Sequence, residues 1–261
     1  MKTDACASQK RDDIQKTKMT QLHSLVLTLL VGLGLPLCAR ADLTNGLIFH
    51  AGFDQDVRAD VAKGNAEPII KGNVRLVEGA RGKAVQIGDS VVTSLDYENE
   101  GNFFAAQGSL AFWMQPVDWL GKQGKAQVIN LFMQGRGSSE GYFGLEMERF
   151  NQPEPMLIFY TYGFPSRKNT AIRCNVSAMW TNGGWYHVVL TWVDTTVKLY
   201  VDGELAGSGQ LTEPFTEADI HSKRFTLGDA GEEHTSLDEF RIWNRPLDAT
   251  EIMEMYRKER R

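Results

Sequence analysis

Apolar and polar side chains alternate along most of the chain between residues 43 and 243. The stretch GLIFHAGFD (46–54) places Leu47, Phe49 and Ala51 on one face, and GSLAFWMQP (108–116) has the same period. A period of two indicates β-strands, because successive side chains of a strand point to opposite faces. Further stretches of strand length are GKAVQIGD (82–89), AQVINLFMQG (126–135), YFGLEMER (142–149) and PMLIFYTYG (155–163).

Two strands and two tight turns are predicted within GGWYHVVLTWVDTTVKLYVDGELAGSG (183–209). Alternate residues from Tyr186 to Trp192 are apolar and share one face. Asp202 and Gly203 then form a pair that is typical of a two-residue hairpin turn, because glycine accepts the positive φ that a type I′ turn requires. This segment is therefore interpreted as scaffold.

The chain ends in a predicted helix. After the strand SLDEFRIWN (236–244), Asp248 and Glu251 have the spacing of a capping box, and Ile252, Met255 and Tyr256 form one apolar stripe. About a dozen strands without helical breaks predict an all-β protein, a two-sheet antiparallel jelly-roll sandwich with a short C-terminal helix. One domain is expected over residues 42–261.

The first 41 residues have a different pattern. A polar and basic segment (10–18) precedes a run of thirteen apolar residues (25–37), and small residues follow at Ala39 and Ala41. This order is typical of a signal peptide cleaved after Ala41, and the run is shorter than the roughly 20 residues that span a bilayer. The sequence thus predicts an exported protein, located in the periplasm, at the cell surface or outside the cell.

Two alternatives remain open for this segment. Lipid attachment at Cys38 would anchor the protein, although Leu37 stands where lipoprotein signals prefer a small residue. Met19 is an alternative start, because a long polar segment ahead of a signal peptide is unusual.

Removal of residues 1–41 changes the charge and the cysteine content. It takes away six basic and three acidic residues, which leaves 22 basic residues, 30 acidic residues and a net charge of about −8. Such a surface argues against nucleic acid or anionic membranes as partners. Only Cys174 remains, so no internal disulfide is expected and the core must supply the stability.

Four segments carry a resemblance to a known family: 46–54, 78–93, 183–209 and 236–256. Together they resemble the laminin-G-like jelly-roll domains of the concanavalin A-like lectin/glucanase superfamily. The resemblance implies the two-sheet fold and a role in binding a glycan or a cell-surface ligand. The segment 117–179 departs from the family pattern, and ligand specificity is expected there.

Because the superfamily includes glycosidases, the resemblance raises the question of a catalytic site. Retaining hydrolysis needs two carboxyl groups about 5 Å apart. Glu146 and Glu148 share a strand face, but no Asp lies between them, and Arg149 and Phe150 follow where a further acid would stand. A solvated outer face explains the two glutamates better, so no catalytic residue is predicted.

Asp238 is the candidate for a structural calcium site, and related domains often carry such an ion. Asp238 alternates with Phe240 and Ile242, which are assigned to the core, and a buried carboxylate needs donors or a cation. Backbone N–H groups of a neighbouring loop are one solution. The other is Ca²⁺, held by Asp238 with Asp54 or Asp60 and loop carbonyls.

Aromatic side chains are the candidates for sugar binding, because the apolar face of a pyranose packs on an aromatic ring. Tyr160 and Tyr162 share one strand face, and Trp119 and Trp180 lie in predicted loops.

The resulting hypothesis is an exported, non-enzymatic, lectin-like module that binds a glycan or a cell-surface ligand. A structural or protein-binding module of an envelope assembly is one alternative. A glycoside hydrolase of the same superfamily is another.

Overall fold

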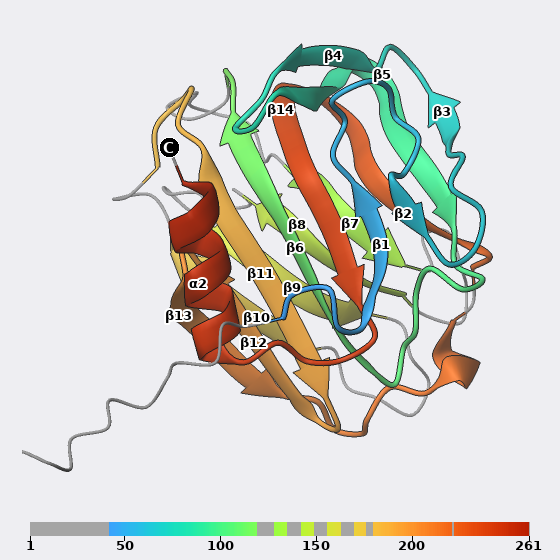
Figure 1. Cartoon of the computed structure of the whole chain (residues 1–261), viewed down its shortest axis with the longest axis vertical. Helices are drawn as coiled ribbons and strands as arrows, with labels where there is room; N and C mark the ends of the chain where they lie inside the picture. Colours follow the sequence, from blue (N-terminus) through green and yellow to red (C-terminus); the bar gives the residue numbers. More distant parts are fainter. Residues whose placement is uncertain are drawn as a thin grey trace, which may run out of the picture. The chain divides into compact units, whose positions relative to one another are not determined.

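The computed structural model describes residues 42–118, 128–134, 142–148, 156–162, 170–175, 180–220 and 222–260. Within the compact unit Ala41–Arg261, two antiparallel sheets pack face to face and one helix lies outside them (Figure 1). The predicted all-β sandwich with a C-terminal helix is therefore confirmed. The predicted signal peptide lies outside the described residues. No helix in the described part is long and apolar enough to cross a membrane.

The strands run antiparallel to their neighbours, in the order β10-β9-β8-β7-β14-β6-β11-β12-β13, with β1 and β5 also paired to β14. Strand β14 pairs with β7 near its start and with β6 along its second half, so it connects the two layers. The elements are β1 (Leu47–Ala51), β2 (Val61–Ala62), β3 (Ile69–Lys71), β4 (Arg75–Glu78), β5 (Lys83–Glu98), β6 (Gln107–Pro116), β7 (Val128–Gln134), β8 (Tyr142–Glu148), β9 (Met156–Tyr162), β10 (Thr170–Asn175), β11 (Tyr186–Val193), β12 (Thr196–Val201), β13 (Glu204–Gln210), the 3₁₀ helix η1 (Glu217–Asp219), β14 (Arg224–Trp243) and α2 (Ala249–Glu259).

Aromatic rings fill the space between the sheets. Phe240 of β14 stacks with Phe112 of β6 and with Phe132 of β7, at centroid distances of 5.9 and 6.2 Å. Phe49 of β1 meets Phe225 edge-on at 5.3 Å. These contacts join strands from both layers in one apolar core, as the alternating pattern predicts.

The hairpin turn and the helix cap form as the sequence indicates. Asp202 and Gly203 both have positive φ, 51° and 85°, as a type I′ turn requires. The Asp248 carboxylate accepts hydrogen bonds from the backbone of Thr250 and Glu251, and Glu251 completes the capping box. Helix α2 then buries Ile252 and Met255 on the outer face of the sheet, against side chains of β6, β11 and β12.

A β-bulge in β14 corrects the predicted position of Asp238. Asp238 pairs with Trp113, whereas the next register pair is Arg241 with Ala111, and Glu239 between them has a φ of 54°. The extra residue shifts the alternation, so Phe240 enters the core while Asp238 lies on the outer face beside Trp113. The prediction that Asp238 shares the face of Phe240 was therefore wrong, although its side chain is fully buried.

Candidate binding site

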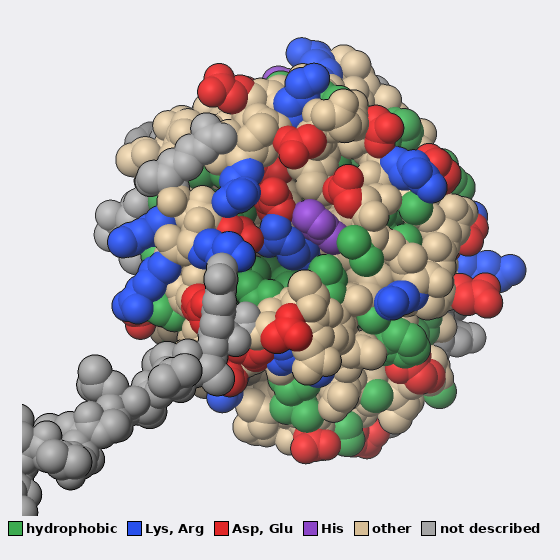
Figure 2. All heavy atoms as spheres, viewed as in Figure 1, with side chains coloured by type: hydrophobic (Ala, Val, Ile, Leu, Met, Phe, Trp, Pro, Cys, Tyr) green, Lys and Arg blue, Asp and Glu red, His purple; other side chains and the backbone are tan. Residues whose placement is uncertain are grey.

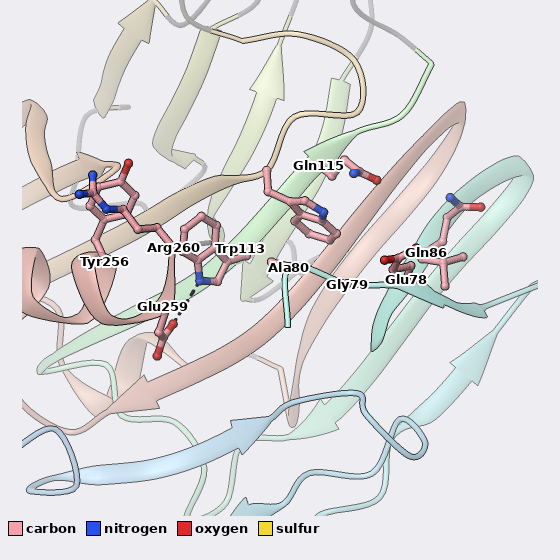
Figure 3. Close-up of a pocket in the computed structure, with 11 residues that line it drawn as sticks. Glu78, Gly79, Ala80, Gln86, Trp113, Gln115, Tyr256, Glu259 and Arg260 are labelled. Carbon is pink, nitrogen blue, oxygen red and sulfur yellow. Dashed lines mark hydrogen bonds between the residues drawn. The ribbon is translucent and has the colours of Figure 1, made fainter. Parts of the chain in front are cut away.

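An open cavity of about 980 Å³ lies on the outer face of the sheet, between the turn that joins β4 to β5 and the last turn of α2 (Figure 3). We call it the sheet-face cavity. Its lining residues come from segments far apart in the sequence: Val77, Glu78, Gly79, Ala80, Gln86, Trp113, Gln115, Trp185, Tyr256, Glu259 and Arg260.

Strand alternation explains why polar and aromatic side chains reach the cavity. Tyr186 pairs with Met114, whose side chain is in the core, so the flanking residues Trp185 and Gln115 belong to the outer face. Trp185 is only partly buried. The amide of Gln115 donates to the carbonyl of Gly183 at 3.0 Å, which fixes the orientation of the Gln115 side chain.

An aromatic wall is formed where α2 crosses the sheet. The ring of Tyr256 stacks with Trp113 at 5.9 Å and with His187 at 6.1 Å. The indole N–H of Trp113 donates to Oε2 of Glu259 at 3.1 Å, which ties the end of α2 to β6. The guanidinium of Arg260 lies 5.5 Å from the centre of the Tyr256 ring.

An ionic network lies beside this wall. Arg241 pairs with Glu259 at 2.9 Å and with Glu239, which also contacts His50 at 2.8 Å and Arg81 at 3.5 Å. Burial acts to raise the pKa of Glu239, but the His50 hydrogen bond and the two arginines together hold that pKa below its usual value. The network therefore fixes the end of α2, the bulge of β14 and the β4–β5 turn relative to one another.

Two carboxylates hold the β4–β5 turn, which forms the opposite wall. Asp238 Oδ2 accepts the backbone N–H of Arg81, and Asp54 Oδ1 accepts that of Lys83, both at 2.9 Å. Gly79 is required here, because a Cβ would lie 2.6 Å from Asp238 Oδ2. Within the described structure, Asp238 Oδ1 and Ser236 Oγ are buried without a hydrogen-bond partner. Burial raises the pKa of Asp238 to about 7, against the effect of the Arg81 N–H.

The three predicted calcium ligands are only partly brought together. Asp54 and Asp238 hold the same turn, whereas Asp60 accepts the N–H of Gly52 at 2.8 Å. Among the described residues, no three His, Cys, Asp or Glu side chains gather as a metal site. Ca²⁺ takes six to eight oxygen ligands, so backbone carbonyls and water would have to supply most of them. The unpaired Asp238 Oδ1 fits such an ion, and calcium stays a prediction.

Of the predicted sugar-binding aromatics, Trp180 and Tyr160 have described side chains, and neither lines the sheet-face cavity. Trp180 is buried and stacks on Tyr186 at 4.5 Å, so its ring face is already covered. Tyr160 is partly exposed on β9 and is not one of the lining residues. Tyr162 also belongs to β9, but its side chain lies outside the described residues, as does all of Trp119.

The two glutamates considered for catalysis, Glu146 and Glu148, belong to β8 as predicted, and their side chains lie outside the described residues. The lining residues that sequence reasoning missed are Trp113, Trp185, Gln86 and Gln115. A signal for Trp185 was present: it precedes a core residue in the alternation and follows two glycines.

The architecture defines a β-sandwich of the concanavalin A-like class. A model of the Laminin_G_3 family, described as the concanavalin A-like lectin/glucanases superfamily, matches residues 83–253. Because this match covers more than half of the chain, the protein belongs to that family. No curated protein matches the sequence.

Solved structures with the same fold come from carbohydrate-binding and toxin proteins. Domain 4 of AbnA, an extracellular GH43 arabinanase from Geobacillus stearothermophilus solved with arabinotriose, is 18% identical with a TM-score of 0.58, covering 80% of this chain and 98% of that one. The binding domain of botulinum neurotoxin DC, solved with rat synaptotagmin II, is 16% identical with a TM-score of 0.64, covering 83% and 52%. A third structure is of botulinum neurotoxin type C, a toxin whose cell entry depends on interaction with two ganglioside molecules. It is 15% identical with a TM-score of 0.63, and the match covers 83% of this chain and 52% of that one. The chain thus spans about half of the toxin structures, and these likenesses establish the fold alone.

Proposed function

We propose that this protein is an exported, non-enzymatic module that binds a glycan through the sheet-face cavity. The observation that carries the proposal is the placement of the partly exposed Trp185 in one cavity with the amides of Gln86 and Gln115. An indole offers a flat apolar face for a sugar ring, and each amide can both donate to and accept from hydroxyl groups. Convergent polar groups around an aromatic surface are typical of ligand sites.

The structural relatives support a binding role by analogy. AbnA domain 4 was solved with an oligosaccharide, and the toxin relatives are linked to gangliosides and to a protein receptor. One fold hosts many functions, so the cavity carries the argument and the relatives only favour the ligand class. The proposal of export is supported by the leader-like pattern of residues 1–41.

The carboxylates of the cavity favour binding over hydrolysis. Glu259 is engaged on both oxygens, by Arg241 at 2.9 Å and by the Trp113 indole at 3.1 Å. The other acidic residue of the described lining is Glu78, which is not engaged by such bonds. Glycoside hydrolysis uses two carboxyl groups with separate roles, and the described lining residues offer one that is not already engaged.

A glycan array tests the proposal. We expect the wild-type protein to bind a defined set of glycans and Trp185→Ala to lose them. Phe104→Ala is the matched control, because Phe104 is an exposed aromatic residue outside the cavity lining, with 39% of its surface exposed. Unchanged binding by Trp185→Ala would contradict the proposal that the glycan binds in the sheet-face cavity.

A second candidate function, protein binding, is favoured by a different surface. The exposed apolar residues of β3, β4 and β5 are Ile69, Ile70, Leu76 and Val92. Among the described strands, β3 and β4 pair only with β5. Exposed apolar groups at a sheet edge are typical of protein contacts. Sedimentation velocity would reveal self-association through this edge, and Ile70→Lys should abolish it.

A further inference from the structure

One wall of the sheet-face cavity carries an exposed cationic group that lies over an aromatic ring. Arg260, the residue that caps α2, lines the cavity, and its guanidinium lies over the Tyr256 ring. Tyr256 is itself stacked on Trp113 and His187 of the sheet. The cation is thus held by a chain of ring contacts that begins on buried strands.

The contact with the Tyr256 ring leaves the N–H donors of Arg260 available. A guanidinium that packs on an aromatic ring uses its flat face, while its N–H groups point outward in the plane and match the oxygens of a carboxylate or sulfate. Within the part of the chain that the structure describes, this guanidinium pairs with no carboxylate. By contrast, Arg241 is fully engaged by Glu239 and Glu259.

The other charges of the cavity leave the α2 wall positive. Glu259 is neutralised by Arg241, and Glu78 belongs to the far wall, opposite Lys83 in the strand register. Arg257 and Lys258 are exposed on the last turn of α2. In Figure 2, basic side chains gather on the side of the molecule where α2 ends. This local field opposes the net negative charge of the chain.

We infer that the ligand of the sheet-face cavity is an acidic saccharide, with its sugar ring on Trp185 and its anionic group on Arg260. This inference rests on the proposed glycan-binding function and specifies the ligand class. The anionic group is an oxyanion with coplanar acceptor atoms, which a sugar carboxylate and a sulfate ester both provide. The neutral amides of Gln86 and Gln115 then read the hydroxyl groups.

An array that carries neutral, carboxylate-bearing and sulfate-bearing oligosaccharides provides the first test. We expect the bound glycans to carry an anionic group, and the two acidic sets separate the carboxylate source from the sulfate source. Binding confined to neutral glycans would overturn the acidic ligand and leave the proposed function standing. No binding to any of the three sets would overturn both.

The strongest acidic hit and its carboxyl-reduced or desulfated form are then titrated calorimetrically into the wild type, Arg260→Gln and Arg257→Gln. Arg257→Gln is the matched control, since it removes an exposed charge from the same helix turn outside the cavity lining. We expect Arg260→Gln to lower the affinity for the acidic ligand by roughly tenfold or more, and Arg257→Gln to change it by less than about twofold. The neutral form of the ligand should bind both variants with the same affinity. Equal affinity of wild type and Arg260→Gln for the acidic ligand would contradict the inference.

Discussion

His187 shows how a single buried residue couples the stability of this protein to pH. Its ring is 1% exposed, contacts Trp113 and Tyr256, and has an Nδ1 atom without a hydrogen-bond partner in the described structure. Burial, with Arg241 acting in the same direction, lowers the pKa of His187 from 6.5 to about 3. Below pH 6.5 this histidine becomes protonated in the unfolded chain, whereas in the folded protein it stays neutral. Stability is therefore lost as pH falls from about 6.5 towards 3.

Replacement of His187 by Phe tests this coupling. We expect stability at pH 7 to remain within about 1 kcal/mol of the wild type, because Phe keeps the ring contacts and removes an unpaired polar atom. Between pH 7 and pH 4 the variant should lose less stability than the wild type, by up to about 3 kcal/mol. Urea unfolding at several pH values measures both effects. Parallel pH profiles would contradict the assigned pKa.

Asp238 is the residue at which the calcium hypothesis is testable. If Ca²⁺ completes the contacts of Oδ1, saturating Ca²⁺ raises the melting temperature of the wild type above its value in EDTA, by mass action on the folded state. Asp238→Asn should abolish the difference. Equal melting temperatures of the wild type in Ca²⁺ and in EDTA would contradict the calcium hypothesis and leave the Arg81 N–H as the contact of the Asp238 carboxylate.

At the scale of elements, the last turn of α2 depends on Arg241. The side chains of Arg241, Glu239 and Glu259 are 14%, 9% and 10% exposed, so removal of the cation leaves two carboxylates poorly solvated. We expect Arg241→Met to lower the free energy of unfolding by about 2–4 kcal/mol. Lys258→Met, on the exposed face of the same helix, should change it by less than about 0.5 kcal/mol. Equal effects in denaturant unfolding would show that the network contributes nothing specific.

The sequence predicts elements well where local chemistry decides them. The hairpin at Asp202 and Gly203 and the capping box at Asp248 formed as expected, because the turn and the cap are set by residues only a few positions apart. The bulge at Glu239 was not predictable. It depends on the register against β6, and simple alternation therefore assigned Asp238 to the wrong face.

At the scale of the whole molecule, the fold was predictable and the site was not. Alternation and the family resemblance indicated the two-sheet sandwich. The sheet-face cavity instead arises where the β4–β5 turn, β6, the residues before β11 and the end of α2 meet, and no local pattern marks that meeting. Trp180 looked like an exposed loop residue, but its stacking partner Tyr186 covers it.

Calorimetric titration of the best array ligand into the wild type, Trp185→Ala and Tyr160→Ala tests the central claim most directly, because it sets the cavity against the aromatic residue predicted from the sequence. The account predicts that Trp185→Ala weakens binding at least tenfold, about 1.4 kcal/mol, while Tyr160→Ala binds like the wild type. Loss of binding in Tyr160→Ala with full affinity in Trp185→Ala would place the ligand on β9 and contradict the account.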